Sequence, residues 1–167
     1  MCRSFLGSYI DENGEYKVDG RFNWNVTSVN LVRLALQSNK DEKEFFKRLR
    51  NALDDCKRLT QGRFEILRHV KAKQAQVLYM SGAIARLNAE DEIEPLLLNG
   101  YSSVSIGYVG LQNCLVALYG KGLEDKSEFI INKAKNIMQF IRDYCEEQKK
   151  ITGFGFSMYG TPKIVGL

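Results

Sequence analysis

The chain has 167 residues, of which 44% are hydrophobic and 26% charged, and its 24 basic and 20 acidic residues give a net charge of +4. These values are typical of one globular domain with a substantial core, and they exclude a disordered or low-complexity chain. No apolar stretch reaches the roughly 18 residues of a membrane span and no signal-peptide pattern is seen, so we expect a cytoplasmic protein without a membrane partner.

The first predicted element is a β-hairpin or a hairpin-like loop. Two extended stretches, Phe5–Ile10 and Tyr16–Val18, flank a polar connection that contains Asn13-Gly14. Asn-Gly supplies the positive φ angles of a tight hairpin turn. The next element, Val26–Leu36, is rich in β-branched and aliphatic residues. We expect it to begin as a strand and to become helical near Leu34.

Two helical stretches are predicted after this strand. Ser38–Glu42 is typical of a helix start, because acidic residues favour the positive end of the helix dipole. A helix is then expected over Lys43–Leu59, where apolar residues recur at three- and four-residue spacing. Gln61-Gly62 is expected to interrupt it, and a second helical stretch is expected over Arg63–Lys73.

Basic and acidic residues alternate along the first of these helices. The basic ones are Lys47, Arg48, Arg50, Lys57 and Arg58, and the acidic ones are Glu44, Asp54 and Asp55. A nucleic-acid-binding protein usually gathers its basic residues on one face. The mixed pattern favours a solvated helix surface and no direct contact with nucleic acid.

The second half of the chain again alternates strand and helix. It contains, in order, a short amphipathic segment at Glu90–Leu98, a strand at Val104–Val109, a helix from Gly110 to Gly120, a helix at Lys126–Lys149 and a strand at Gly153–Tyr159. Gly160-Thr161-Pro162 is expected to end the last strand. Because long crossovers separate the strands, the sequence predicts an α/β fold with at least a partly parallel sheet.

Cysteine and histidine residues are few and scattered. They are Cys2, Cys56, Cys114, Cys145 and the single histidine, His69. Since no Cys-x-x-Cys pair occurs, the sequence predicts no metal site and four free thiols. Cys114 and Cys145 fall on apolar helix faces and are expected to be core thiols, whereas His69 is expected at the surface.

Five segments, taken in order, resemble a known enzyme family. They are Met1–Gly7, Gly20–Asn25, Arg86–Asp91, Asn99–Leu111 and Thr152–Pro162. Their sequence and separation resemble the catalytic chain of the anaerobic ribonucleoside-triphosphate reductases, the glycyl-radical branch of ribonucleotide reduction. The resemblance covers residues 1–162 almost without interruption. It implies a portion of the ten-stranded α/β barrel of the glycyl-radical enzymes and ribonucleotide reductases.

The resemblance gives Cys2 a catalytic role. Taken alone, a cysteine so near the start of the sequence is more simply an exposed, inert thiol. In the family, a Gly-Cys-Arg segment lies at the tip of a loop inserted into the barrel, and its cysteine becomes a thiyl radical that abstracts hydrogen from C3′ of the ribose. Here Met1 stands where the family has the glycine, which changes the expected loop tip.

Three further residues are implied as substrate contacts. Asn23 matches the family asparagine that faces the substrate ribose, where an amide can hold the 2′-hydroxyl by donating and accepting hydrogen bonds. The alternative is a turn asparagine that satisfies its own backbone. Gly160 and Thr161 belong to the family's Thr-Pro loop, which leads into a helix whose free N–H groups suit phosphate. The family pattern is lost after Pro162.

We therefore interpret residues 1–162 as a partial catalytic barrel domain that includes the radical-cysteine loop, and residues 163–167 as a divergent tail. The glycyl radical, installed by an S-adenosylmethionine/iron–sulfur activase, and the family's structural zinc are expected outside this sequence. The expected substrate is a ribonucleoside triphosphate, and we expect the fragment to be inactive alone. The alternatives are a subunit of a split reductase that works only with complementary chains, and a non-catalytic interaction module or decayed remnant.

Overall fold

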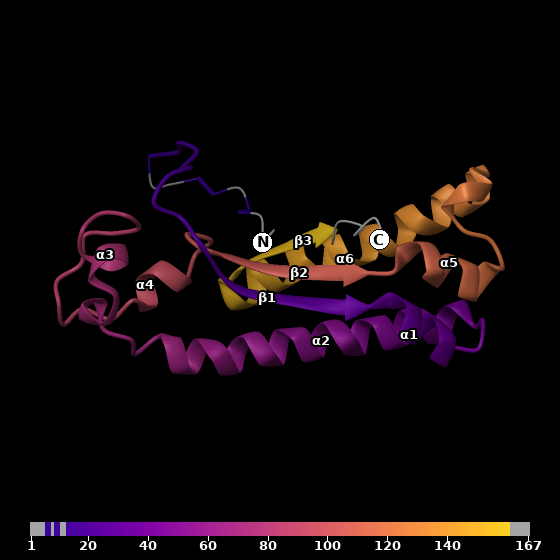
Figure 1. Cartoon of the computed structure of the whole chain (residues 1–167), viewed down its shortest axis with the longest axis horizontal. Helices are drawn as coiled ribbons and strands as arrows, with labels where there is room; N and C mark the ends of the chain where they lie inside the picture. The colour runs from indigo at the N-terminus through magenta and orange to yellow at the C-terminus, as the bar shows by residue number, and fades with distance from the viewer. Residues whose placement is uncertain (1–5, 8, 11–12, 161–167) are drawn as a thin grey trace, which may run out of the picture.

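The fold is built on one sheet of three parallel strands, which Figure 1 shows in the order β1-β2-β3. The computed structural model describes residues 6–7, 9–10 and 13–160. The strands are β1 (Asn23–Asn30), β2 (Ser103–Val109) and β3 (Gly155–Gly160). Both strand pairs are parallel. This confirms the predicted α/β fold and is consistent with a portion of a larger α/β barrel.

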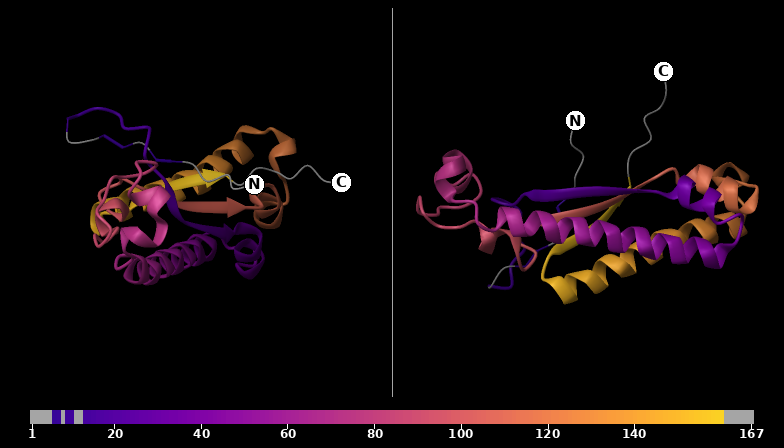
Figure 2. Two further views of the ribbon diagram at one scale, coloured as in Figure 1. Left: turned by 60° about the vertical axis from the view of Figure 1, so that its left-hand side comes forward. Right: turned by 90° about the horizontal axis from the view of Figure 1, so that it is seen from below.

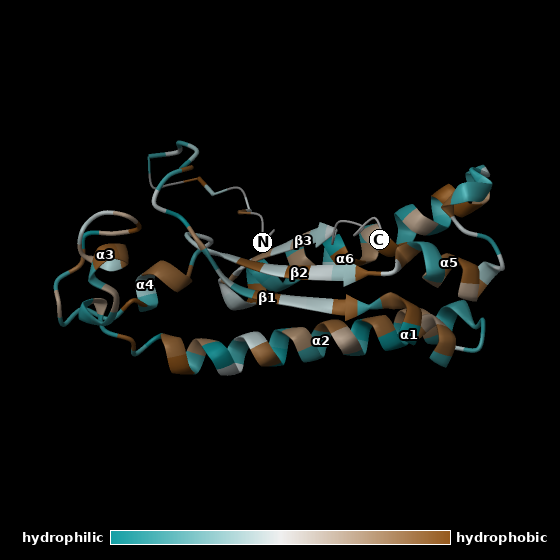
Figure 3. Ribbon diagram, viewed as in Figure 1, coloured by the Kyte–Doolittle hydropathy of each residue, from teal (hydrophilic) through white to brown (hydrophobic). Residues whose placement is uncertain are grey.

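Two long helices form a layer on one side of the sheet. They are α2 (Glu42–Leu67) and α6 (Glu128–Thr152), and Figure 2 shows both on the same side of the strands. Hydrophobic and polar bands alternate along α2 in Figure 3, as expected for a helix with one buried side. The helices therefore shield one sheet face from water.

The remaining elements are short. Beyond the carboxyl ends of the strands, α1 (Leu31–Gln37) packs against α5 (Leu111–Tyr119). The others are the 3-10 helices η1 (Ala72–Ala75) and η2 (Leu123–Asp125) and the single-turn helices α3 (Gln76–Tyr79) and α4 (Glu94–Leu97). The segment with η1, α3 and α4 lies near the opposite end of the sheet from α1 and α5 (Figure 1).

The core lies between the sheet and the two long helices. Val104, Ile106 and Phe156 point from the sheet into it and are fully buried. The helices contribute Phe45, Leu49 and Leu53 from α2 and Ile130, Ile137 and Ile141 from α6. A fully buried aliphatic side chain contributes about 1.5–3 kcal/mol relative to an exposed one. This layer therefore supplies most of the hydrophobic stabilisation of the fold.

The predicted interruption at Gln61-Gly62 is wrong, because α2 runs through it as one helix of 26 residues. A glycine inside a helix costs only about 1 kcal/mol relative to alanine. Thr60 and Phe64, on either side of it, are both buried against the rest of the protein. Packing of these two residues outweighs the poor helix propensity of Gly62.

One other predicted boundary also moved, whereas the N-terminal hairpin-like loop is confirmed. The change from strand to helix occurs at Leu31, earlier than predicted, because the Asn30 side chain caps α1 and accepts a hydrogen bond of 3.1 Å from the Arg33 amide. In the N-terminal segment, an antiparallel bridge joins Ile10 and Tyr16 among the described residues, which agrees with the predicted hairpin or hairpin-like loop. Gly14 within it has a φ of +81°, as the Asn-Gly turn predicted.

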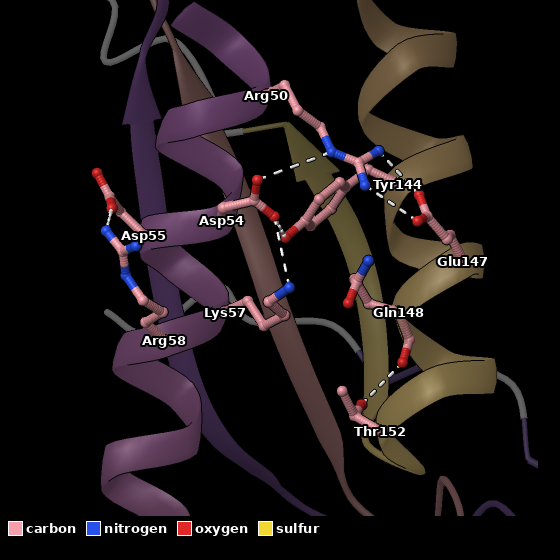
Figure 4. A network of polar contacts seen from close by, with 9 residues as sticks. All are labelled: Arg50, Asp54, Asp55, Lys57, Arg58, Tyr144, Glu147, Gln148 and Thr152. Carbon is pink, nitrogen blue, oxygen red and sulfur yellow. Dashed lines mark hydrogen bonds and ion pairs between the residues drawn. The ribbon is translucent and has the colours of Figure 1, made fainter.

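Helices α2 and α6 are also joined by polar contacts, which Figure 4 shows. The hydroxyl of buried Tyr144 donates a 2.8 Å hydrogen bond to Asp54. Arg50 lies over the Tyr144 ring and donates two hydrogen bonds, of 2.8 and 3.0 Å, to Glu147. Lys57 pairs with Asp54 at 3.5 Å. The alternating charges of α2 therefore form ion pairs on a helix surface, as the sequence predicted.

Candidate functional site on the open face of the sheet

Apart from Val26, which pairs with Ser105, the second face of the sheet carries mainly small and polar residues. We call it the open face and define it by Asn23 and Ser28 of β1, Ser103, Ser105 and Gly107 of β2, and Ser157 and Tyr159 of β3. In Figure 1, α6 passes behind β2 and β3, and within the described part of the chain no helix crosses in front of them. Side chains on this face are therefore available to segments that approach from the other side.

The N-terminal segment approaches this face at Gly7. Its amide donates a 2.7 Å hydrogen bond to the Ser103 hydroxyl, across 96 positions of sequence. A Cβ placed on Gly7 would lie 3.6 Å from Ser103 Oγ and 3.7 Å from Ser157 Cβ. Gly7 thus lies in contact with β2 and β3. The radical-loop residue predicted from the sequence, Cys2, lies outside the described residues.

Asn23 reaches the open face because the register of β1 shifts beside it. Asn23 pairs with Ser103 and Asn25 with Val104, so Trp24 is an extra residue in β1. Such a bulge changes the face to which the preceding side chain points. The Asn23 amide consequently donates a 2.5 Å hydrogen bond to Ser105 on the open face. Asn25, only two positions later, is buried on the other face.

The helix-side asparagine has a structural role. Asn25 is 2% exposed and donates a 2.6 Å hydrogen bond to the Thr60 hydroxyl of α2. Its carbonyl oxygen accepts a hydrogen bond from Arg63. Trp24, between the two asparagines, packs against Phe154 with ring centroids 5.6 Å apart. The predicted site residue Asn23 and the structural residue Asn25 are thus separated by the fold, although they are close in sequence.

Gly107 permits close contact across the open face. A Cβ there would lie 2.6 Å from the Tyr159 ring and 2.7 Å from Ser28 Oγ. With only hydrogen at this position, the hydroxyls of Ser28 and Tyr159 come within 3.2 Å of each other over β2. The three strands are therefore linked by side chains on this face as well as by their backbones.

The structure does not bring the predicted substrate residues into one cluster. Gly160 pairs with Tyr108 near the end of β2, whereas Asn23 pairs with Ser103 at its start. At roughly 3.3 Å per residue the two rows are about 16 Å apart along the strands. A ligand that touches both must be extended along the sheet. Thr161, the other predicted contact, lies outside the described residues.

A cavity of about 610 Å³ adjoins the amino-terminal ends of the strands and is lined in part by Tyr9, Arg21, Gly100 and Lys149. Arg21 closes one side of it, donating hydrogen bonds of 2.9 Å to the Tyr101 carbonyl and 3.0 Å to the Gly100 carbonyl. Burial lowers the pKa of Arg21, but guanidinium pKa values are so high that it stays charged. These contacts tie the base of the N-terminal loop to the start of β2.

The other chemically reactive residues lie away from this face. Cys114 and Cys145 are fully buried free thiols, and burial raises the pKa of each to about 12. Cys56 is a free thiol at an intermediate depth. His69 is exposed and lies 3.4 Å from Glu92. These positions confirm the predicted free thiols for all but Cys2 and the predicted surface location of His69.

Neither a metal site nor a membrane span is found in the residues that the structure describes. No group of three or more His, Cys, Asp or Glu side chains there could hold a metal ion. Of the described helices, none is long and apolar enough to cross a membrane.

The serine residues of the open face were not predicted from the sequence. Ser103 and Ser105 are 1% and 0% exposed, yet both hydroxyls accept hydrogen bonds from elements that are distant in sequence. The signal was present in and just before the predicted strand Val104–Val109, where Ser103, Ser105 and Gly107 alternate with apolar residues. Alternation places such residues on one face, and small polar residues on a buried face indicate close approach of another chain segment.

A family model and curated proteins that match the sequence carry the same family description. Residues 1–163 match the family model described as "Anaerobic ribonucleoside-triphosphate reductase". The protein of that name from Escherichia coli strain K12 is 41% identical over 162 residues, which are 96% of this chain and 23% of that protein. The corresponding protein of Enterobacteria phage T4 is 35% identical over 166 residues, covering 96% of this chain and 26% of that protein. The chain thus spans about a quarter of the length of the curated relatives it matches.

The fold agrees with the sequence match. A crystal structure of the anaerobic ribonucleotide reductase from Thermotoga maritima, with citrate in its active site, aligns with a TM-score of 0.63 and 20% identity. The alignment covers 96% of this chain and 28% of that chain. At this identity the likeness shows a shared fold. From the family match over nearly its whole length, the chain belongs to the anaerobic ribonucleoside-triphosphate reductase family.

Proposed function

We propose that this chain forms part of the catalytic barrel of an anaerobic ribonucleoside-triphosphate reductase, an enzyme that makes 2′-deoxyribonucleotides for DNA replication. The observation that carries the proposal is the family match over residues 1–163. The position of Asn23 on the open face, beside buried Ser105, supports it. Since the chain covers only 23% of the Escherichia coli relative, the activity of the whole enzyme requires further barrel segments.

In the proposed reaction Cys2 gives its thiol hydrogen atom to a glycyl radical outside this sequence and becomes a thiyl radical. Its sulfur then takes a hydrogen atom from C3′ of the ribose, so an S–H bond forms, the C3′–H bond breaks and the unpaired electron passes to the sugar. These two bonds are close in strength, which makes the transfer nearly thermoneutral and reversible. At the end of the cycle Cys2 returns the hydrogen atom to C3′.

The reduction itself needs electrons from outside the chain. Loss of the 2′-hydroxyl as water and its replacement by hydrogen consume two electrons and two protons, which an external reductant, formate or a thiol protein, supplies. Asn23 would bind the 2′-hydroxyl through its amide. Gly160 and Thr161 would contact the phosphates near the carboxyl ends of the strands. The separation of Asn23 from Gly160 along the sheet fits an extended nucleotide.

The proposed partners follow from the same chemistry. The chain would bind complementary reductase chains that carry the glycyl radical, which a radical-generating activase using S-adenosylmethionine and an iron–sulfur cluster installs. The family's structural zinc does not fit the described residues, because these offer no group of three or more suitable ligands. No step of the proposed mechanism is therefore assigned to a metal in this chain.

A chimeric enzyme tests the proposal. Residues 1–162 of this chain would replace the matching segment of the Escherichia coli relative, and anaerobic conversion of ribonucleoside triphosphates would be measured after radical activation. We expect deoxyribonucleotide formation that Cys2→Ser abolishes, because a hydroxyl O–H bond is too strong to give the equivalent radical. Cys114→Ser serves as the control, since that thiol is buried on a helix, and it should retain most activity.

Three results would separate the alternatives. Activity when this chain is mixed with separate complementary chains would identify a split-enzyme subunit. A folded chimera without activity would contradict the proposed function and favour a non-catalytic module or decayed remnant. Equal losses from Cys2→Ser and Cys114→Ser would show that the catalytic assignment of Cys2 is wrong.

A further inference from the structure

We propose that Ser105 is the positioning residue for Asn23, and that its buried hydroxyl holds the Asn23 amide in the orientation in which it meets the substrate ribose. The inference rests on the proposed function, which makes Asn23 a substrate contact. It goes beyond that function because it assigns a role to a residue of a different strand. Ser105 itself would touch neither the ribose nor the phosphates.

The side chains of Asn23 and Ser105 are in direct contact. Asn23 Nδ2 lies 2.5 Å from Ser105 Oγ, across 82 positions of sequence and between neighbouring strands. Ser105 is 0% exposed. A buried polar side chain is costly unless it is hydrogen-bonded. Because solvent does not reach Ser105, water does not compete for this hydrogen bond. The bond therefore restricts Asn23 more than a surface hydrogen bond would.

The hydrogen bond to Ser105 also limits the rotation of the Asn23 amide. The terminal torsion of an asparagine is broad and roughly two-fold, so rotamer preference alone does not orient its amide. The bulge at Trp24 turns the Asn23 side chain toward the open face, but it does not fix that torsion. The Ser105 hydroxyl supplies a restraint on the amide through its hydrogen bond. Groups that bind a reacting substrate must be held within about 0.5 Å of their productive positions.

A neighbouring serine provides a matched comparison. Ser102 immediately precedes β2 and is also 0% exposed. Its hydroxyl has no hydrogen-bond partner within the described part of the chain. Ser102→Ala and Ser105→Ala remove the same atom from equally buried sites that are three positions apart on one segment. Only the second removes a contact to Asn23.

Whether Ser105 orients the Asn23 amide can be tested on the chain itself. The ¹⁵N-labelled chain would be compared by NMR with its Ser105→Ala and Ser102→Ala variants, following the side-chain amide signals of Asn23. We expect Ser105→Ala to move these signals and to broaden them, because the amide loses its hydrogen bond to Ser105. Ser102→Ala should leave them in place. Unchanged Asn23 signals in a folded Ser105→Ala variant would overturn the inference whatever the function of the chain.

The functional part is tested by a double-mutant cycle in the chimeric reductase described above. We expect Ser105→Ala to lower kcat/KM about tenfold, which corresponds to loss of one positioned hydrogen bond. In an Asn23→Ala background the same substitution should change kcat/KM less than twofold, because no amide remains to be positioned. Ser102→Ala should have less than a twofold effect in either background.

The outcomes distinguish this inference from the proposed function. An inactive parent chimera that folds contradicts the proposed function, and with it the substrate-facing role of Asn23. An active chimera in which Ser105→Ala costs the same factor with and without Asn23 overturns the inference alone, since additive losses mean a general structural role. The positioning role of Ser105 is supported if Ser105→Ala no longer lowers kcat/KM in the Asn23→Ala background and also changes the Asn23 amide signals in the NMR experiment.

Discussion

The two faces of the sheet use alternate residues of the same strands for different purposes. On β2, Val104 and Ile106 point toward the helices, and Ser103 and Ser105 point to the open face. All four are at most 1% exposed. The apolar pair packs against α2 and α6, whereas the serines accept hydrogen bonds from Gly7 and Asn23. The two pairs of side chains are equally buried. They differ in chemistry, because the apolar pair forms the core and the serine pair holds other segments by hydrogen bonds.

The largest effect on stability should come from the helix-covered face. Ile106→Ala removes three buried carbons from a fully buried site, and such a change typically costs about 2–5 kcal/mol because a cavity remains. Ser157→Ala on the open face should change the free energy of unfolding by less than about 0.5 kcal/mol, because the Ser157 hydroxyl lacks a partner among the described residues. Urea unfolding measures both. Similar costs for the two variants would contradict the division between the faces.

A second effect should come from the contact across the open face at Gly107. Gly107→Ala places a Cβ 2.6 Å from the Tyr159 ring and 2.7 Å from Ser28 Oγ, and overpacking of this kind costs about 1–3 kcal/mol. Gly62→Ala is the control, because nothing lies within 4 Å of the added carbon in α2. It should stabilise the chain by about 0.5–1 kcal/mol. A destabilising Gly62→Ala and a neutral Gly107→Ala would contradict the packing described for both sites.

The contact between α2 and α6 should make stability depend on alkaline pH. Burial raises the pKa of Tyr144, and its hydrogen bond to Asp54 raises that pKa further. Above the ordinary tyrosine pKa of about 10, the unfolded chain loses this proton while the folded chain keeps it. Stability should therefore fall as pH rises beyond 10. Tyr144→Phe should cost about 1 kcal/mol at neutral pH and should reduce the alkaline fall, which thermal unfolding across the pH range can measure.

The smallest effect is expected at the exposed end of the same network. Glu147 pairs with Arg50 through two hydrogen bonds, but both side chains are more than 40% exposed. Exposed ion pairs contribute about 0–1 kcal/mol and weaken in salt. Glu147→Gln should therefore shift the urea midpoint only slightly, and less at high salt. A loss as large as that of Ile106→Ala would mean that the core is not the main source of stability.

Local sequence patterns predicted most of the secondary structure correctly. Gly110 and Gly120 lie at the two ends of α5, as predicted for the helix between them, and both have positive φ angles. The parallel sheet followed from the long crossovers. The continuity of α2 through Gly62 could not be predicted, because the packing that preserves it comes from other elements. The short helices between residues 72 and 79 have no clear apolar period and were also missed.

The candidate site was only partly accessible from the sequence. Asn23 could be named from the family resemblance, but the bulge at Trp24 that turns it toward Ser105 depends on strand register. A shift of one residue exchanges the faces of a strand, and nothing in residues 23–25 alone shows where the extra residue lies. Ser105 was missed for the same reason, since its partner lies on another strand. Cys2 and Thr161 remain predictions, because both lie outside the described residues.

The most direct test of the different roles of the two sheet faces compares two adjacent residues of β2 in the chimeric reductase. Val104 and Ser105 are both 0% exposed, and alanine removes only a few atoms from either. Val104→Ala should lower the unfolding midpoint but leave kcat/KM within about twofold at temperatures where the enzyme is folded. Ser105→Ala should lower kcat/KM about tenfold with a smaller change in the midpoint. If both variants lose activity only in proportion to stability, the open face has no functional role distinct from the core.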